Sequence, residues 1–64
     1  MKYKILTVSA VSGLATKFEH ASIELAQMVN HEILEGWKPI GGVAVGATQQ
    51  TKEPHLFQSM IREE

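Results

Sequence analysis

The sequence predicts an α+β fold in which one helix covers one face of a three-stranded mixed sheet. Between positions 17 and 35, apolar residues recur every three or four positions, which is the spacing of a helix with one buried side. Segments typical of β-strands lie on both sides of this helix, and Gly and Pro residues separate it from the strands that follow. We therefore expect the order strand, helix, strand, strand in a single domain of residues 1–64.

The first strand is expected from Lys2 to Ser9. This segment is short and rich in Tyr, Ile, Leu, Thr and Val, the residue types that favour strands. Ser12 and Gly13 follow it and favour a loop.

The helix is expected to begin near Lys17. Thr16 and Glu19 have the spacing of a capping box, in which both side chains accept hydrogen bonds from free backbone N–H groups of the first turn. The stripe expected to face the core consists of apolar residues at helical spacing: Phe18, Ala21, Leu25, Val29 and Ile33, with Met28 beside them.

Gly36 and Pro39 predict that the helix ends by Glu35, because Gly adopts the left-handed conformation of a C-terminal cap and Pro cannot continue the helix. Glu32 and Glu35 lie at the negative end of the helix dipole, so we expect cationic partners for them. The apolar surface also extends beyond the stripe, to Ile23 and Leu34. We interpret this extra surface as a subunit interface.

Two further strands are expected, from Ile40 to Thr48 and from His55 to Arg62, with a polar connection at 49–54. The first of them alternates between a face of larger side chains and a face with almost none. The larger face carries Val43, Val45 and Ala47, and the other carries Gly42, Ala44 and Gly46. A strand face lined by Gly allows another backbone, a helix or a ligand to approach closely.

The long connection through the helix makes the first two strands parallel, and the short return makes the third antiparallel to both. The simplest arrangement places the third strand in the middle, giving a mixed sheet of order 1-3-2. Its second face and its outer edges would be bare in a monomer, which favours association with a second copy.

Composition excludes several classes of protein. The 64 residues are too few for a two-domain enzyme, and the absence of Cys excludes disulfides, thiolate metal sites and Cys nucleophiles. The net charge of −1 is far from that of a general DNA- or RNA-binding protein. A domain this small needs an additional source of stability, and we expect a homo-oligomer, a dimer or larger.

Targeting signals are weak. Lys2 and Lys4 before an apolar run resemble the start of a secretory signal, but Thr7, Ser9 and Ser12 dilute that run. No apolar segment approaches the length of about 20 residues that a membrane span needs. We expect a soluble cytoplasmic protein that does not contact a membrane.

A longer pattern resembles a known family. The pattern is Val29-Asn30-x-x-Ile33-x-x-Gly36-Trp37-x-Pro39-x-Gly41-Gly42, preceded by Tyr3-Lys4-Ile5 and followed by Gln58-Ser59-Met60-Ile61-Arg62. Over nearly the whole chain it resembles the small domain family catalogued as domain of unknown function seventeen thirty-seven, found in bacterial and phage proteins. The polar segment from Gln49 to Pro54 is the one obvious departure. The resemblance implies the strand-helix-strand-strand fold and no established activity.

Catalysis, cofactors and metal binding are not expected. His20 and His31 lie three helical turns apart, about 16 Å along the axis, so they cannot share a metal within one chain. We expect these residues and His55 to be exposed or at an interface. No nucleophile elbow, phosphate-binding loop or dinucleotide fingerprint is present in the sequence.

If the chain binds a small ligand, the expected site combines an aromatic ring, backbone close to the ligand, and cations. Its residues are Trp37, Lys38, Gly41, Gly42 and Arg62, with Gln49 and Lys52 on a loop from the same or a neighbouring subunit. Trp offers a stacking surface for a base, Gly pairs expose N–H groups to anions, and Lys and Arg neutralise phosphate. The alternative is architectural: Trp37 pins the helix to the sheet, the glycines form a bulge, and the cations are solvated.

Three functions follow. The first is a non-enzymatic oligomer that binds a small anionic ligand, in its most specific form a phage anti-defence sponge that sequesters a cyclic nucleotide immune signal. This form rests on analogy with other small oligomeric phage proteins. The second is a structural module for self-assembly or protein interaction, without a ligand. The third is an enzyme that cleaves a nucleotide.

Overall fold

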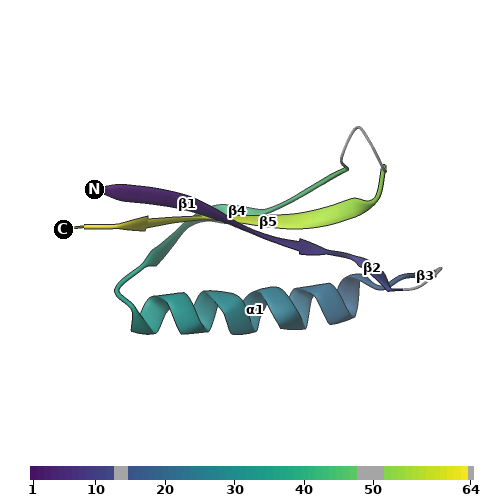
Figure 1. The fold of residues 1–64 in the computed structure, drawn as a ribbon, viewed down its shortest axis with the longest axis horizontal. Coiled ribbons are helices and arrows are strands. Elements are labelled where there is room, and N and C mark those ends of the chain that lie inside the picture. Colours follow the sequence, from purple (N-terminus) through teal and green to yellow (C-terminus); the bar gives the residue numbers. More distant parts are fainter. Residues whose placement is uncertain (13–14, 48–51, 64) are drawn as a thin grey trace.

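The computed structural model describes residues 1–12, 15–47 and 52–63, and it has two layers, a sheet above and a helix below (Figure 1). The elements in chain order are β1 (Lys2–Ser9), β2 (Val11–Ser12), β3 (Ala15–Thr16), α1 (Phe18–Leu34), β4 (Lys38–Ala47) and β5 (Pro54–Arg62). The α+β class and the helix on one face of the sheet are confirmed.

The main sheet has the order β1-β5-β4, with the C-terminal strand in the centre. β5 pairs antiparallel with both neighbours, for example Val8 with Leu56 on one side and Val45 with Leu56 on the other. The expected mixed sheet is therefore wrong: β1 and β4 are parallel to each other but are not neighbours. The C-terminal strand does lie between the other two long strands, as the expected order 1-3-2 placed it, and only the labels differ, because β2 and β3 form a separate sheet.

The two strands that the sequence analysis missed are β2 and β3, which form a separate two-stranded sheet where a loop was expected. Val11 pairs with Thr16 in this sheet. The expected capping box is wrong for the same reason, because Thr16 belongs to β3 and Lys17 occupies the N-cap without a side-chain hydrogen bond. The Lys17 N–H instead donates to the Ala10 carbonyl at 2.7 Å, so backbone pairing sets where the helix begins.

The end of the helix agrees with the sequence analysis. Gly36 has a φ of +93°, in the left-handed region. Its N–H donates to the Ile33 carbonyl at 3.1 Å, and the Trp37 N–H donates to the Glu32 carbonyl at 3.0 Å. These two bonds are those of a Schellman motif, which satisfies the last carbonyls of a helix and turns the chain toward β4.

The core lies between α1 and the strands β1 and β5. Its buried apolar residues are Val8, Ala10, Ala21, Leu25, Trp37, Leu56 and Met60. Phe18 and Ile33 were expected in this core but are 44% and 47% exposed. The reason is that α1 packs mainly against β1 and β5 and least against β4, which leaves the helix side that faces β4 uncovered.

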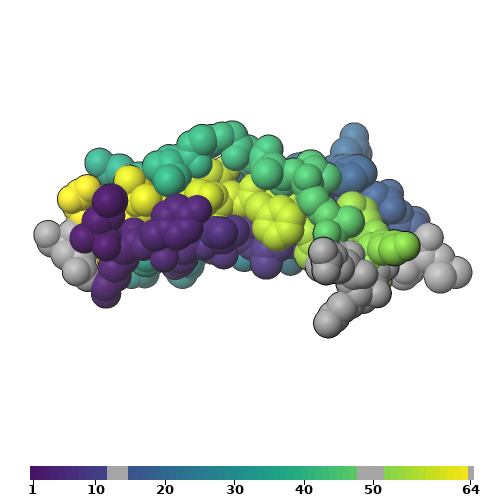
Figure 2. All heavy atoms as spheres, turned by 90° about the horizontal axis from the view of Figure 1, so that it is seen from above, coloured from purple at the N-terminus to yellow at the C-terminus, as the bar shows by residue number. Residues whose placement is uncertain are grey.

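The face of the sheet opposite the helix is open, and Figure 2 views this face with β1, β5 and β4 running side by side. Tyr3 and Ile5 on β1 are more than half exposed there. The Tyr3 and Ser59 hydroxyls share a hydrogen bond of 2.8 Å across the two strands. In the described residues, no helix has the length and apolar character to cross a membrane.

Replacement of Gly36 by Ala is expected to lower the free energy of unfolding by about 1 to 2 kcal/mol, because an L-residue is strained in the left-handed region. Gly42→Ala is the matched control, since Gly42 has ordinary φ and a Cβ there would meet no atom within 4 Å. We expect the control to be neutral or stabilising by up to about 1 kcal/mol. Urea unfolding at fixed protein concentration measures both, and equal effects would contradict the assignment of the cap.

Candidate functional site

Trp37 follows the helix cap directly and is buried, with 9% of its surface exposed. Two cations lie over its ring: the Lys4 Nζ is 4.1 Å from the ring centroid, and the Arg62 Cζ is 5.0 Å from it. Cation–π contacts of this kind contribute about 0.5 to 2 kcal/mol. A ring that is buried beneath two side chains packs the helix end against the sheet, and it offers little surface on which a base can stack.

The same two cations contact the last turn of α1. The Lys4 ammonium forms an ion pair with the Glu32 carboxylate, and the Arg62 Nη1 donates to the Glu35 carbonyl oxygen at 3.4 Å. The expectation of a cationic partner is confirmed for Glu32, and the partner comes from β1 of the same chain. Positive charge at a helix C-terminus is favourable because it opposes the negative end of the dipole. Arg62 and Trp37, both expected in the site, therefore do lie together.

Lys38 is exposed at the start of β4, where it faces Ile61 in the register of the sheet. At the same end Lys2 lies opposite Arg62, and Lys4 lies over Trp37. Four of the six Lys and Arg residues of the chain thus gather at the end of the sheet where both termini lie (Figure 1). We call Lys2, Lys4, Lys38 and Arg62 the basic end.

Gly41 and Gly42 lie in an irregular part of β4, a bulge between Ile40 and Ala44. Gly41 has a φ of +71°, which explains a Gly at this position. The buried amide of Gln58 fills the bulge: its Nε2 donates to the Ile40 carbonyl at 3.1 Å and to the Gly41 carbonyl at 3.5 Å. The Gly41 carbonyl that faces this site is thus occupied by the protein itself.

Sequence reasoning missed Gln58 as a structural residue. The available signal was a polar amide on the inward face of the central strand, between the apolar positions Leu56 and Met60. A polar side chain at such a position needs hydrogen-bond partners, because an unpaired buried amide is costly. The bulge carbonyls supply those partners.

The remaining two residues of the expected site do not join it within one chain. Gln49 lies outside the described residues. Lys52 precedes β5 at the opposite end of the sheet from Lys38, since Ala47 pairs with Pro54 there. The ten residues of β4 span about 30 Å at roughly 3.3 Å per residue. Lys52 can approach Trp37 only from a neighbouring copy.

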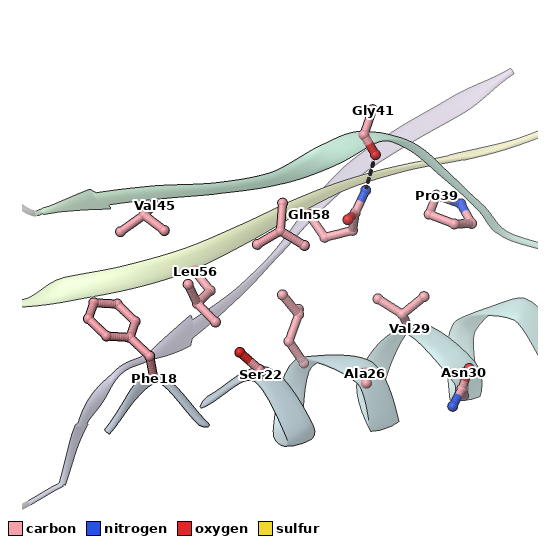
Figure 3. Close-up of a pocket in the computed structure, with 12 residues that line it drawn as sticks. Phe18, Ser22, Ala26, Val29, Asn30, Pro39, Gly41, Val45, Leu56 and Gln58 are labelled. Carbon is pink, nitrogen blue, oxygen red and sulfur yellow. Dashed lines mark hydrogen bonds between the residues drawn. The ribbon is translucent and has the colours of Figure 1, made fainter. Parts of the chain in front are cut away.

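A groove of about 650 Å³ lies between α1 and β4, and we call it the α1–β4 groove. Figure 3 shows helix side chains below it, side chains of β4 and β5 above it, and Gln58 bonded to Gly41. Its lining residues are Phe18, Ser22, Leu25, Ala26, Val29, Asn30, Pro39, Gly41, Val43, Val45, Leu56 and Gln58. None of them is charged. The sequence analysis did not anticipate this groove.

The three histidines lie apart from one another in the fold, two on α1 and one on β5. In the described part of the chain, no three His, Asp or Glu side chains come together as metal ligands. His20 and His31 are exposed on α1. The His55 Nδ1 donates to the Glu53 carbonyl at 2.9 Å, and its ring stacks with Phe57 at a centroid distance of 6.3 Å.

Comparisons with family models, with curated proteins and with solved structures found no match to this chain. The resemblance to the domain family therefore stays a prediction. The function must be argued from the surfaces described above.

Replacement of Lys4 by Met is expected to lower the free energy of unfolding by about 1 kcal/mol, because it removes a cation–π contact and a partly exposed ion pair while keeping an apolar stem. Lys17→Met is the control, because Lys17 is exposed at the other end of α1. The fluorescence of Trp37, the sole Trp, reports unfolding in urea. Equal stabilities of the two variants would show that the contacts with Trp37 and Glu32 contribute nothing.

Proposed function

We propose that this chain is a non-enzymatic, self-assembling interaction module that works as a homo-oligomer. The observation that carries the proposal is the amount of large apolar surface that one copy leaves in water. Among the described residues, ten large hydrophobic side chains are exposed: Met1, Tyr3, Ile5, Phe18, Ile23, Ile33, Leu34, Ile40, Val43 and Val45. Only seven hydrophobic residues are buried, and two of these are Ala.

The distribution of these side chains supports assembly. Scattered exposed apolar residues are normal on a monomer, whereas contiguous apolar patches mark contact surfaces. Here Phe18, Val43 and Val45 line the α1–β4 groove, and Tyr3 and Ile5 lie together on one strand of the open sheet face. In addition, β4 pairs with β5 on one side only, so its outer edge has no strand partner in the described residues. Unprotected edges and apolar faces are the features that a second copy would cover.

The size of the chain supports the same proposal. A domain of about 60 residues buries only about 60% of the surface of its unfolded chain, which leaves a small margin of stability. Association adds buried apolar area without lengthening the chain. The chain has no Cys, so disulfides cannot supply that margin.

In solution, the purified protein is expected to have a mass of at least twice the 7.1 kDa of one chain. Burial of the exposed apolar side chains provides the free energy of association. Size-exclusion chromatography with light scattering measures this mass. Protein concentrations between about 1 and 100 µM cover dissociation constants in the micromolar range. A folded monomer over the whole range would contradict the proposal.

A second candidate is binding of a small anionic ligand, and the basic end favours it. Lys4 and Arg62 lie over the Trp37 ring, Lys2 and Lys38 lie at the same end of the sheet, and an oligomer that brings two such ends together would multiply the positive charge. A cyclic nucleotide is the ligand to test first, because it offers phosphates for the cations. The lining of the α1–β4 groove carries no charge, so an anionic ligand would bind at the basic end and not in the groove.

For this candidate, the protein is mixed with a panel of cyclic dinucleotides and trinucleotides, and bound ligand is recovered after heat denaturation. Intact ligand supports sequestration, an altered product would indicate an enzyme, and no bound ligand would contradict the candidate. We expect Lys38→Ala to weaken binding about tenfold at low salt. Lys17→Ala removes the same charge at the opposite end of α1 and should leave binding unchanged.

A further inference from the structure

The α1–β4 groove is a consequence of where the helix lies. Because α1 packs most on β1 and least on β4, the helix covers the inward side chains of β4 only in part. Val43 and Val45 are 54% and 62% exposed as a result. Figure 3 shows Val45 and Pro39 above the groove and Phe18, Ala26 and Val29 below it. The groove therefore follows the helix from its first turn to near its last.

The apolar surface of α1 continues from the groove around to the outer side of the helix. At 100° per residue, Ile33, Ala26, Ile23 and Leu34 follow one another around the helix, starting from the groove side. Ile23 is 60% exposed and Leu34 is 85% exposed. Glu19, in the first turn, and Asn30 are the polar residues that interrupt this flank. The opposite flank is polar and carries His20, Glu24, His31 and Glu35.

The groove and the apolar helix flank are complementary to each other. The groove lacks charged side chains and is bordered by Ser22 and Ala26, whose small size lets a second helix approach closely. A helix about 10 Å wide with a mostly apolar flank fits this groove. The α1 of another copy has that flank, and it is the one helix in the described chain.

The surface available is also large enough. A standard interface removes about 800 Å² from each partner, which is about a sixth of the accessible surface of 4656 Å². The groove and the flank together present six large side chains with exposed fractions between 44% and 85%. These side chains are Phe18, Ile23, Ile33, Leu34, Val43 and Val45.

We propose that a second copy of this chain occupies the α1–β4 groove. The α1 of each copy lies in the groove of the other. Each α1 lies beside the α1 of the other copy and beneath its β4, in an antiparallel arrangement around a twofold axis. Such a contact is isologous, because the same residues of both copies meet. This proposal rests on the proposed function and adds which surface makes the contact. Assembly through the open sheet face would therefore overturn the groove contact and leave the proposed function standing.

The first test uses two neighbouring residues of β4 that point to opposite faces. Val45→Glu places a charge in the groove, and Ala44→Glu places the same charge on the open sheet face. Both positions are exposed in one copy, so neither charge should unfold it. We expect Val45→Glu to raise the dissociation constant at least about 100-fold, because a buried charge without a partner is costly. Ala44→Glu should leave the light-scattering mass unchanged.

The second test uses the natural absence of Cys. Ala26 is the middle residue of α1, so in a twofold antiparallel pair it lies nearest the axis. Mild oxidation of Ala26→Cys should therefore link two chains, since a disulfide needs Cα atoms within about 4.4 to 6.8 Å. Glu24→Cys on the polar flank is the control and should stay unlinked. Non-reducing gel electrophoresis gives the result.

The outcomes separate the two proposals. A wild-type oligomer that Ala44→Glu dissociates and Val45→Glu does not would overturn the groove and keep the self-assembling module. Crosslinking of Glu24→Cys without that of Ala26→Cys would also overturn the groove. A wild-type monomer would remove both proposals.

Discussion

The width of a single helix limits how much of this sheet can be covered. Three strands spaced about 4.8 Å apart make a sheet about 14 Å wide, whereas a helix with its side chains is about 10 Å wide. The chain places α1 over β1 and β5, where Val8, Leu25 and Leu56 form the core. The third strand, β4, is then covered least, and both the α1–β4 groove and the exposed side chains along it follow from that placement.

The groove opens along β4 because the C-terminal end of α1 is fixed to the other two strands. The Schellman motif at Gly36 turns the chain, and Trp37 then fits beneath Lys4 of β1 and Arg62 of β5. Both cations also contact the last helical turn, through Glu32 and the Glu35 carbonyl. These contacts tie the helix end to β1 and β5.

Local patterns predicted the long elements closely, because each depends on residues near in sequence. The first strand was predicted with its observed bounds, and the helix within one residue at each end. The two-residue strands β2 and β3 are too short to show a period, and their pairing moved Thr16 out of the cap. The bulge filled by Gln58 and the groove depend on contacts between distant segments, which periodicity does not report.

For the site, sequence alone left two roles open for Trp37, as a stacking surface and as a packing residue. Its burial beneath Lys4 and Arg62 favours packing. The residue types that suggest phosphate binding are the same types that close a helix end against a sheet, so their presence near a Gly-Trp pair does not distinguish the roles. The position of Trp37 in the fold distinguishes the two roles, because a stacking surface for a base needs an exposed ring.

The two candidate surfaces of this chain, the α1–β4 groove and the basic end, differ in charge and lie in different places. The groove and the apolar flank of α1 are uncharged except for Glu19, whereas the basic end lies where both termini meet the last helical turn. Salt does not weaken an apolar contact by screening, whereas a phosphate contact weakens steeply as salt rises. Assembly through the groove would leave Lys38 in water, because it lies on the opposite face of β4 from Val43 and Val45. Self-assembly and anion binding are therefore physically compatible in one molecule, and the salt dependence of each separates them.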